Sequence, residues 1–300
     1  MINTYQVKII ENFCKDKFKE DTRTKDFFHT FLAQNLEIYT NIEDQKYAKD
    51  TILIYKIFDI CIICIKDGVS VSQEYCQFKK GVIDHIVVYT DENMNDGKIS
   101  QLLRGSSTLK IDKSNCYDNP DIKVVFSEKG FLFQARFNNC ESKFNDTMTM
   151  FALSLAYREK MEYYLNLTSS IIDEENYHDV IDIKKDFYVF NLKYFFSNPV
   201  HYNYQQKHAI WKIIFQYYDI LEQHQELKIQ IENLVDILHI EQNQEEDKKE
   251  KIKENKRKKN RNDFFNYRWF CYFSFVGQCI QRRYGIIWLK SYIILAKQAF

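Results

Sequence analysis

Hydrophobic and polar residues in the N-terminal half of the chain alternate with the two-residue period of β-strands. Runs rich in Ile, Val and Cys occupy residues 51–66 and 82–90, and each run ends in a polar turn sequence. Between residues 122 and 137, the segments IKVVF and FLFQARF flank the sequence SEKG. This pattern predicts a β-hairpin in which Gly130 takes the left-handed backbone conformation that a three-residue loop needs.

Two segments nearer the N-terminus carry apolar residues at helical spacing. We interpret residues 5–20 and 26–48 as helices that flank the strands. Strands joined by short turns pair in the antiparallel sense, because parallel pairing needs a long crossover. The expected fold class is therefore α+β, with residues 1–142 forming a mostly antiparallel sheet with flanking helices.

The second half of the chain changes to a period of about 3.6 residues, which is typical of helices. Asn145-Asp146 is a candidate N-cap for the first helix. A second helix is expected over about residues 178–196, ending before Asn198-Pro199. A third begins near Tyr204 and could run unbroken to about residue 259, because this stretch contains no Gly or Pro. So long a helix is a stalk or a coiled coil, or else it breaks. The sequence thus predicts a long-helix domain over residues 143–262.

A stripe of apolar residues follows the third helix at alternating spacings of three and four. Such spacing over about four heptads is typical of coiled coils, whose stripe residues face a partner helix. Two interpretations stay open, namely a helical bundle within one chain and self-association into a homo-oligomer. His224 lies on the stripe, and we interpret it as a polar residue that sets helix register. This heptad stripe comprises Ile210, Ile213, Tyr217, Ile220, His224, Leu227, Ile231, Leu234 and Leu238, and all of these except Ile210 form the expected self-association site.

A basic run follows the stripe, and the aromatic sequence FFNYRWFCYFSFVGQCI comes directly after it. Cations beside aromatic-rich sequence are typical of segments that contact an anionic membrane surface, at about 1 kcal/mol per cation. Closely spaced cations also bind the phosphates of nucleic acids, and a third interpretation is a solvated helix face with the aromatic residues packed on the core. The residues expected to contact a membrane or polyanion are Lys248, Lys249, Lys251, Lys253, Lys256, Arg257, Lys258, Lys259, Arg261, Trp269 and Trp288.

The C-terminal segment, residues 263–300, contains two apolar stretches. The first, residues 264–280, includes Asn266 and Arg268, and the second, residues 286–296, includes a lysine. Crossing a bilayer takes about 20 predominantly apolar residues. The sequence therefore favours contact with a membrane over a span across it.

The amino-acid composition argues against several classes of protein. Lys plus Arg is 42 and Asp plus Glu is 42, which disfavours a globally basic nucleic-acid-binding protein. Only 7 Gly and 2 Pro occur in 300 residues, which excludes collagen-like and glycine-loop cofactor folds. The eight cysteines are expected to be reduced, because the N-terminal sequence lacks the apolar core of a signal peptide. We therefore expect a cytoplasmic location, which includes the cytoplasmic face of a membrane.

The order of these parts resembles the CorA-like divalent-cation transporter family, in which a soluble domain leads through a stalk helix into membrane helices. The passages FYVFNLKYFFSNPVHYNYQQKHAIW and YYDILEQHQELKIQIENLVDIL carry the resemblance, which covers about residues 150–240. It implies self-association and membrane contact. The family's Gly-Met-Asn signature is absent and Val276-Gly277-Gln278 offers no equivalent, so no pore or metal residue is carried over.

An enzymatic alternative comes from Asp121, Glu141 and Lys143. Pro120-Asp121 followed by Glu-Ser-Lys resembles the PD-(D/E)xK nuclease motif. In that chemistry two carboxylates hold Mg²⁺ and a lysine steadies the attacking water. Glu141 and Lys143 would share one face of a strand, because they are two residues apart.

The sequence lacks the common motifs for nucleotide, zinc-protease and serine-hydrolase chemistry. Cys61 and Cys64 have the spacing of half a zinc site, but no matching pair accompanies them, and we interpret them as buried thiols. The sequence therefore favours a non-catalytic, CorA-like, self-associating protein that contacts a membrane through its C-terminus, without a cofactor. The alternatives are an Mg²⁺-dependent nuclease and a soluble nucleic-acid-binding adaptor.

Overall fold

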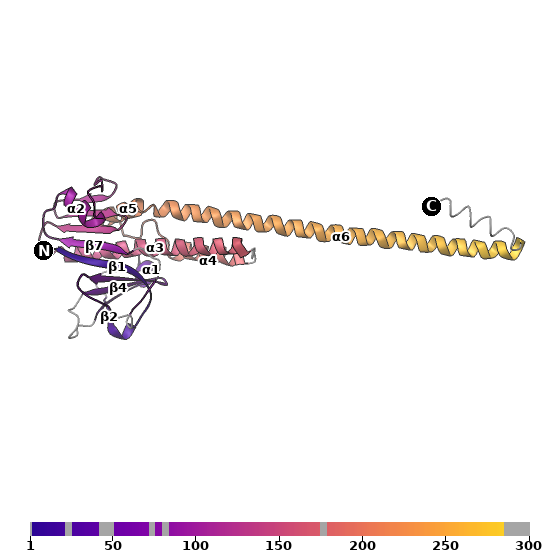
Figure 1. The fold of residues 1–300 in the computed structure, drawn as a ribbon, viewed down its shortest axis with the longest axis horizontal. Coiled ribbons are helices and arrows are strands. Elements are labelled where there is room, and N and C mark those ends of the chain that lie inside the picture. The colour runs from indigo at the N-terminus through magenta and orange to yellow at the C-terminus, as the bar shows by residue number, and fades with distance from the viewer. Residues whose placement is uncertain are drawn as a thin grey trace. The chain divides into compact units, whose positions relative to one another are not determined.

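The chain divides into two units, Met1–Val235 and Asp236–Phe300. The computed structural model describes residues 2–21, 26–41, 51–71, 76–79, 84–174 and 179–284. The first unit contains the sheet and the helices up to the start of α6, and the described part of the second unit is the continuation of α6 (Figure 1). The boundary expected at residue 142 falls inside the first unit, because the helices that follow the sheet pack against it.

A ten-stranded mixed sheet is the centre of the first unit. Its order is β2-β3-β4-β5-β1-β7-β10-β9-β8, and β6 also pairs with β1. The pair β7–β10 is parallel and the other pairs are antiparallel. The strands are β1 (Ile2–Phe13), β2 (Phe18–Glu20), β3 (Leu36–Asn41), β4 (Ile52–Ile57), β5 (Ile60–Lys66), β6 (Cys76–Phe78), β7 (His85–Thr90), β8 (Cys116–Asp118), β9 (Ile122–Ser127) and β10 (Gly130–Ala135).

The longer helices follow the sheet in the chain, and two shorter helices lie between its strands. The long α3 contacts β4 and β5 as well as α4 and α5. The helices are α1 (Thr30–Gln34), α2 (Asp96–Arg104), α3 (Glu141–Glu174), α4 (Val180–Lys193), α5 (Gln205–Tyr217) and α6 (Ile220–Tyr284), with a short 3-10 helix at Lys15–Lys17. Together with the sheet they confirm the predicted α+β class.

The sheet is buried on both faces around β7, β9 and β10. Phe131 faces α3, where its ring centroid lies 5.2 Å from that of Phe151. Leu132, the next residue, belongs to a buried cluster with Ile99 and Leu103 of α2. Neighbouring strand residues point to opposite faces, so α2 and α3 lie on opposite sides of the sheet. Burial on both faces explains why these strands are continuous apolar runs.

The predicted hairpin at residues 122–137 is confirmed as β9–β10, but the three-residue loop is wrong: Ser127 pairs with Gly130 across the two-residue turn Glu128-Lys129, and Gly130 begins β10. Gly130 has a φ of +136°. A Cβ atom there would lie 1.8 Å from the carbonyl oxygen of Ile86 in β7. The glycine is therefore required by the close approach of a neighbouring strand as well as by the turn.

The helices predicted near the N-terminus are wrong. Residues 5–20 form β1, the 3-10 helix and β2, and residues 26–48 include α1 and β3 within their described part. Strand β1 pairs with β5 on one side and β7 on the other. Its Val7, Ile9 and Ile10 are consequently buried, and these adjacent apolar residues had imitated a helical spacing.

The long third helix breaks, which is one of the outcomes that its length left open. Helix α5 ends at Tyr217 and α6 begins at Ile220. Between them, Asp219 takes a left-handed backbone with a φ of 49°. Aspartate tolerates this conformation better than most residues, so the chain turns here without Gly or Pro.

Candidate functional site

The basic run lies on α6 in the second unit, and all nine of its cations are exposed. Lys249 pairs with Glu245 at 3.4 Å, and Lys258 pairs with Glu254 at 2.9 Å. Such exposed ion pairs contribute little to stability. The cations therefore remain available to an anionic partner.

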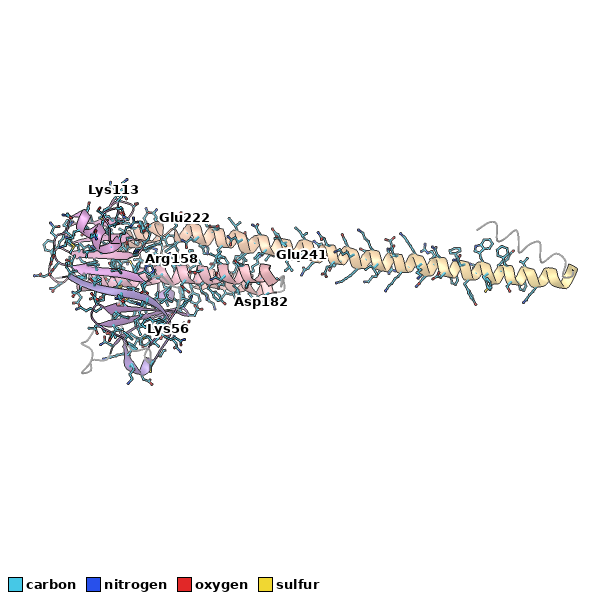
Figure 2. All side chains as sticks on the ribbon, viewed as in Figure 1. Lys56, Lys113, Arg158, Asp182, Glu222 and Glu241 are labelled. Carbon is cyan, nitrogen blue, oxygen red and sulfur yellow. The ribbon has the colours of Figure 1, made fainter. Side chains whose placement is uncertain are left out.

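An aromatic band follows the basic run on the same helix. Its eight side chains are between 52% and 75% exposed. Successive residues of an α-helix are turned by about 100°, so the band presents aromatic groups on every side, and side chains surround this part of the ribbon in Figure 2. The band comprises Phe264, Phe265, Tyr267, Trp269, Phe270, Tyr272, Phe273 and Phe275.

Trp269 follows the basic run on α6 and is 57% exposed. Its ring stacks on Phe273 with 5.5 Å between centroids. Trp288, the other predicted contact residue, lies outside the described residues. Within residues 2–284 as far as they are described, no helix is both long enough and apolar enough to cross a membrane.

The heptad stripe is buried inside the chain along most of its length. Ile213 and Tyr217 belong to α5 and are half-buried, whereas the stripe residues from Ile220 onward belong to α6. The α4 side chain of Tyr188 donates a hydrogen bond of 2.8 Å to Glu232 of α6. The fully buried members are Ile210, Ile220, Leu227, Ile231, Leu234 and Leu238.

His224 occupies the stripe as a packed, uncharged residue. Its ring stacks on Phe195 with 3.9 Å between centroids, and Nε2 lies 2.7 Å from Oδ1 of Asn191. Burial, followed by the charge of Lys228, lowers the pKa of His224 to about 4. The neutral ring therefore packs between α4, α6 and the segment after α4.

The three nuclease-motif residues do not form the predicted arrangement. Glu141 and Lys143 lie in the first turn of α3, which begins four residues before the expected cap at Asn145. Residues two positions apart on a helix point to nearly opposite sides, whereas residues two positions apart on a strand point to the same side. Lys143 Nζ pairs with Asp121 Oδ2 at 2.7 Å, whereas Glu141 lines a separate pocket. In the described part of the chain, no three His, Cys, Asp or Glu side chains are grouped to hold a metal ion.

Cys61 and Cys64 are buried on β5, as the sequence interpretation expected. The thiol of Cys64 lies 3.6 Å from the sulfur of Met148 in α3. Burial raises the pKa of the Cys64 thiol, and burial likewise raises that of Cys61. Both residues therefore serve as packed apolar groups.

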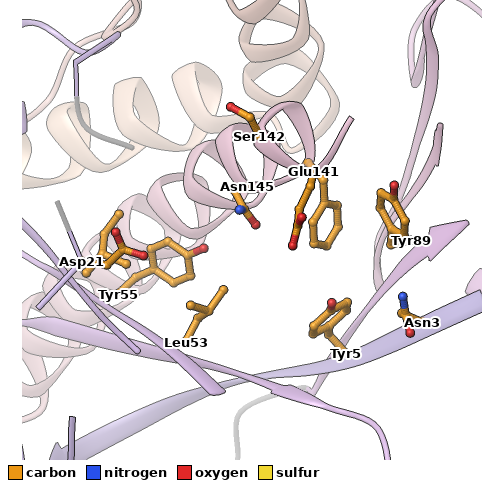
Figure 3. Close-up of a pocket in the computed structure, with 11 residues that line it drawn as sticks. Asn3, Tyr5, Asp21, Leu53, Tyr55, Tyr89, Glu141, Ser142 and Asn145 are labelled. Carbon is orange, nitrogen blue, oxygen red and sulfur yellow. The ribbon is translucent and has the colours of Figure 1, made fainter. Parts of the chain in front are cut away.

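A pocket of about 550 Å³ lies between the sheet and the start of α3 (Figure 3). Sequence reasoning missed it, because its walls come from several segments that are far apart in the chain. The sequence contains one indication of the pocket: the spacing of Glu141, Phe144 and Asn145 places these residues on one face of a helix. The lining comprises Asn3, Tyr5, Asp21, Ile38, Leu53, Tyr55, Tyr89, Glu141, Ser142, Phe144 and Asn145.

Aromatic rings and carboxylates give this pocket its chemistry. The Phe144 ring lies 5.5 Å from that of Tyr5 and 5.1 Å from that of Tyr89, between centroids. Burial first, and then nearby negative charge that includes Glu141, raises the pKa of Tyr89. Burial likewise raises the pKa of Tyr55, and the charge of Asp21 acts in the same direction. Tyr55 and Tyr89 are therefore neutral phenols.

Comparisons with protein-family models, with curated proteins and with solved structures found no match to this chain. Two features are candidate sites: the basic run with the aromatic band on α6, and the pocket of the first unit.

Proposed function

We propose that the protein attaches to anionic membrane surfaces through residues 248–275 of α6. The basic run would bind lipid headgroups, and the aromatic band would enter the interface beside them. The observation that supports this proposal is the adjacency of nine exposed cations and eight exposed aromatic side chains on one helix. Aromatic residues favour the bilayer interface, because their rings suit both its apolar and its polar layers.

The apolar contribution follows from the exposure of the band. Full burial of a large apolar side chain contributes about 1.5–3 kcal/mol relative to leaving it in water. A helix that is apolar on every side is stable when its surroundings are apolar on every side. A bilayer offers such surroundings, and a helix lying flat on the surface would leave part of the band in water. We therefore expect the band to enter the interface at a steep angle.

The one charged residue among residues 264–275, Arg268, is compatible with this position. Arg268 has a long side chain whose charged end reaches headgroups while its stem stays among apolar groups. Residues 264–275 form about 18 Å of helix at about 1.5 Å per residue. The hydrocarbon core is about 30 Å thick, so the band corresponds to about one leaflet.

The electrostatic contribution comes from residues 248–261, where nine cations and two glutamates leave a net charge of +7. A cation near an anionic leaflet contributes about 1 kcal/mol, and this attraction weakens as salt screens it. The cations and the band reinforce each other, because lipidated and amphipathic segments generally need two weak signals for stable attachment.

A second copy of the chain is the competing partner for the band. Parallel packing of two such helices would bring two stretches of charge +7 side by side, which is electrostatically unfavourable. Most of the heptad stripe is already buried within the chain. The membrane proposal therefore does not depend on self-association, and the CorA-like resemblance, without its Gly-Met-Asn signature, adds membrane contact and not transport.

A vesicle flotation assay tests the proposal. The full chain is compared with a chain ending at Asn262, using phosphatidylcholine vesicles with and without phosphatidylserine. We expect the full chain to float with the anionic vesicles and the truncated chain to stay at the bottom of the gradient. Equal behaviour of the two chains would overturn the proposal.

Matched variants separate the band from general hydrophobicity. The test variant replaces Trp269, Phe270 and Phe273 by Ser. The control replaces three exposed apolar residues of the first unit by Ser, namely Phe137, Leu192 and Tyr202, which are 62%, 82% and 82% exposed. Flotation should be lost in the test variant and kept in the control. Sedimentation equilibrium without vesicles would reveal the competing result, a stable oligomer that dissociates in the test variant.

A further inference from the structure

We propose that one side of the basic run binds the multiply phosphorylated headgroup of an inositol lipid. This inference rests on the membrane attachment proposed above and names the lipid that the attachment site selects. Three features support it: the distribution of charge around α6, the neighbours of the central lysines, and the position of the run beside the aromatic band.

The charges of residues 248–261 are divided unequally between two sides of the helix. Successive residues are turned by about 100°, which places five lysines within about 140° of the circumference and no acidic residue among them. The other charged residues, four cations and two glutamates, occupy about 120° on the opposite side. The lysine side, of charge +5, comprises Lys248, Lys249, Lys253, Lys256 and Lys259, and the mixed side, of charge +2, comprises Glu250, Lys251, Glu254, Arg257, Lys258 and Arg261.

The middle of the lysine side places like charges next to one another. Lys256 has Lys253 three residues before it and Lys259 three residues after it. Such like-charged neighbours destabilise a helix. On the mixed side, in contrast, Lys258 pairs with Glu254 at 2.9 Å. A bound polyanion would therefore remove a repulsion that the helix itself leaves in place.

Along the helix axis, the lysine side ends at an acidic residue in each direction. Glu245 pairs with Lys249 at 3.4 Å at the first end, and these two side chains are 70% and 69% exposed. Asp263, also exposed, follows Lys259 by four residues at the other end. Ion pairs as exposed as that of Lys249 are weak, so a multiply charged ligand can displace the carboxylate.

The spacing of the central lysines suits a ligand with several negative charges close together. Lys249, Lys253 and Lys256 are four and three residues apart, so they lie within about 60° of one another and span about 10 Å of the axis. All three are exposed. An inositol headgroup carries several phosphates on one ring, and each phosphate can accept charge-assisted hydrogen bonds from an ammonium group. Cation clusters beside a membrane-binding segment are typical sites for such lipids.

The position of the lysine side favours a lipid over a soluble inositol phosphate. Lys259 lies about 8 Å along the axis from Phe264, where the aromatic band begins, and Lys256 lies about 12 Å from it. A band held in the interface would keep these lysines beside headgroups that stand out from the leaflet. The two attachments would then reinforce each other, because each alone is weak.

Vesicle binding of the full chain tests the lipid preference. One set of phosphatidylcholine vesicles contains phosphatidylserine and the other contains phosphatidylinositol bisphosphate, in amounts that give equal total lipid charge. We expect about tenfold tighter binding to the inositol lipid, as for one additional charge-assisted hydrogen bond. Equal binding to both sets would overturn this inference and leave the attachment proposal standing. Binding to neither set would overturn the attachment proposal as well.

Matched variants distinguish the lysine side from net charge. Each variant replaces three cations by Gln and so loses the same charge. The test variant changes the lysine side at Lys249, Lys253 and Lys256, and the control changes the mixed side at Lys251, Arg257 and Arg261. Both should bind phosphatidylserine vesicles more weakly, but only the test variant should lose the preference for the inositol lipid. Equal loss of preference in both would overturn the inference, with circular dichroism as the check that α6 stays helical.

Free inositol trisphosphate separates the lipid from its soluble headgroup. Titration calorimetry measures its binding to the full chain without vesicles. We expect this binding to be weaker than binding to the inositol-lipid vesicles, because the aromatic band then contributes nothing. Equally tight binding would assign the lysine side to a soluble inositol phosphate and overturn the lipid assignment.

Discussion

Helix α6 carries two sets of apolar residues that differ in how they meet their surroundings. The heptad stripe occupies one side of the helix, and its members Leu227 and Ile231 are 0% and 1% exposed. The aromatic band occupies every side of the helix, and its Phe270 is 75% exposed. A one-sided apolar pattern can be buried by a neighbouring helix of the same chain, whereas a pattern on all sides needs an environment from outside it. The heptad stripe of α6 therefore contributes to the fold, whereas we propose that the aromatic band contributes to membrane attachment.

The largest difference between the two sets should appear in stability. We expect Leu227→Ala to lower the free energy of unfolding of the first unit by about 3 kcal/mol, because it leaves a cavity in a packed site. Phe270→Ala should change it by less than about 0.5 kcal/mol, as most exposed substitutions do. Urea denaturation followed by circular dichroism measures both. Equal losses in the two variants would contradict the distinction between stripe and band.

The next effect concerns the basic run. Replacing Lys256, Arg257 and Lys259 by Gln should weaken binding to anionic vesicles by about 3 kcal/mol at low salt, at about 1 kcal/mol per cation. The matched control replaces Lys110, Lys113 and Lys129, which are exposed lysines of the first unit. Vesicle binding of the control should be unchanged. If duplex DNA instead binds the full chain and the chain ending at Asn262 equally, with a steep salt dependence, the cations serve a nucleic acid.

A smaller effect should come from pH, through the histidine of the stripe. Burial lowers the pKa of His224 to about 4, below the usual value of about 6.5 in an unfolded chain. The unfolded chain therefore takes up a proton first as pH falls, and stability that is fully present above about pH 6.5 is lost progressively toward pH 4. With partial exposure allowed for, the expected loss is about 2 kcal/mol.

Variants show how much of this pH dependence comes from each buried histidine. Burial, followed by the charge of Arg158, also lowers the pKa of His85 to about 4, so two histidines contribute over the same pH range. Denaturation curves between pH 7 and pH 4 should become shallower in His224→Leu and nearly flat when His85→Phe is added. A slope that His224→Leu leaves unchanged would show that the ring is not neutral in the folded chain.

The smallest expected effect is at the exposed ion pairs of α6. Lys249→Gln breaks the ion pair with Glu245. The two side chains of this pair are 69% and 70% exposed. Pairs of this kind contribute about 0.3–0.5 kcal/mol to a helix. Helix content measured by circular dichroism should therefore be almost unchanged. A large loss of helix would mean that α6 depends on ion pairs more than its exposure indicates.

The sequence predicted those parts of the fold in which one pattern had one structural outcome. The β9–β10 hairpin was found because two apolar runs flank a short polar turn that ends in Gly130. Helix α4, Val180–Lys193, was found because its period is clear and Asn198-Pro199 follows it. The α+β class followed from these local patterns.

Other parts depended on contacts between distant segments. Strand β1 resembled a helix because its burial by β5 and β7 on both sides could not be read from its own residues. Glu141 lies in a helix and not in the strand that the nuclease motif requires, so its spatial neighbours differ from the predicted ones. It lines the pocket instead. The pocket itself needs Asp21 and Tyr89 to come together through sheet pairing, which no local spacing encodes.

Asp219 has a further consequence for anyone who would redesign this protein. This one left-handed residue, with a φ of 49°, sets the rotation of the start of α6 relative to α5. If a helix-favouring residue straightened this joint, α5 and α6 would merge into one rod, and buried Trp211 and Tyr218 could no longer both keep their places. An insertion or fusion should therefore avoid residues 217–220, however permissive their composition looks.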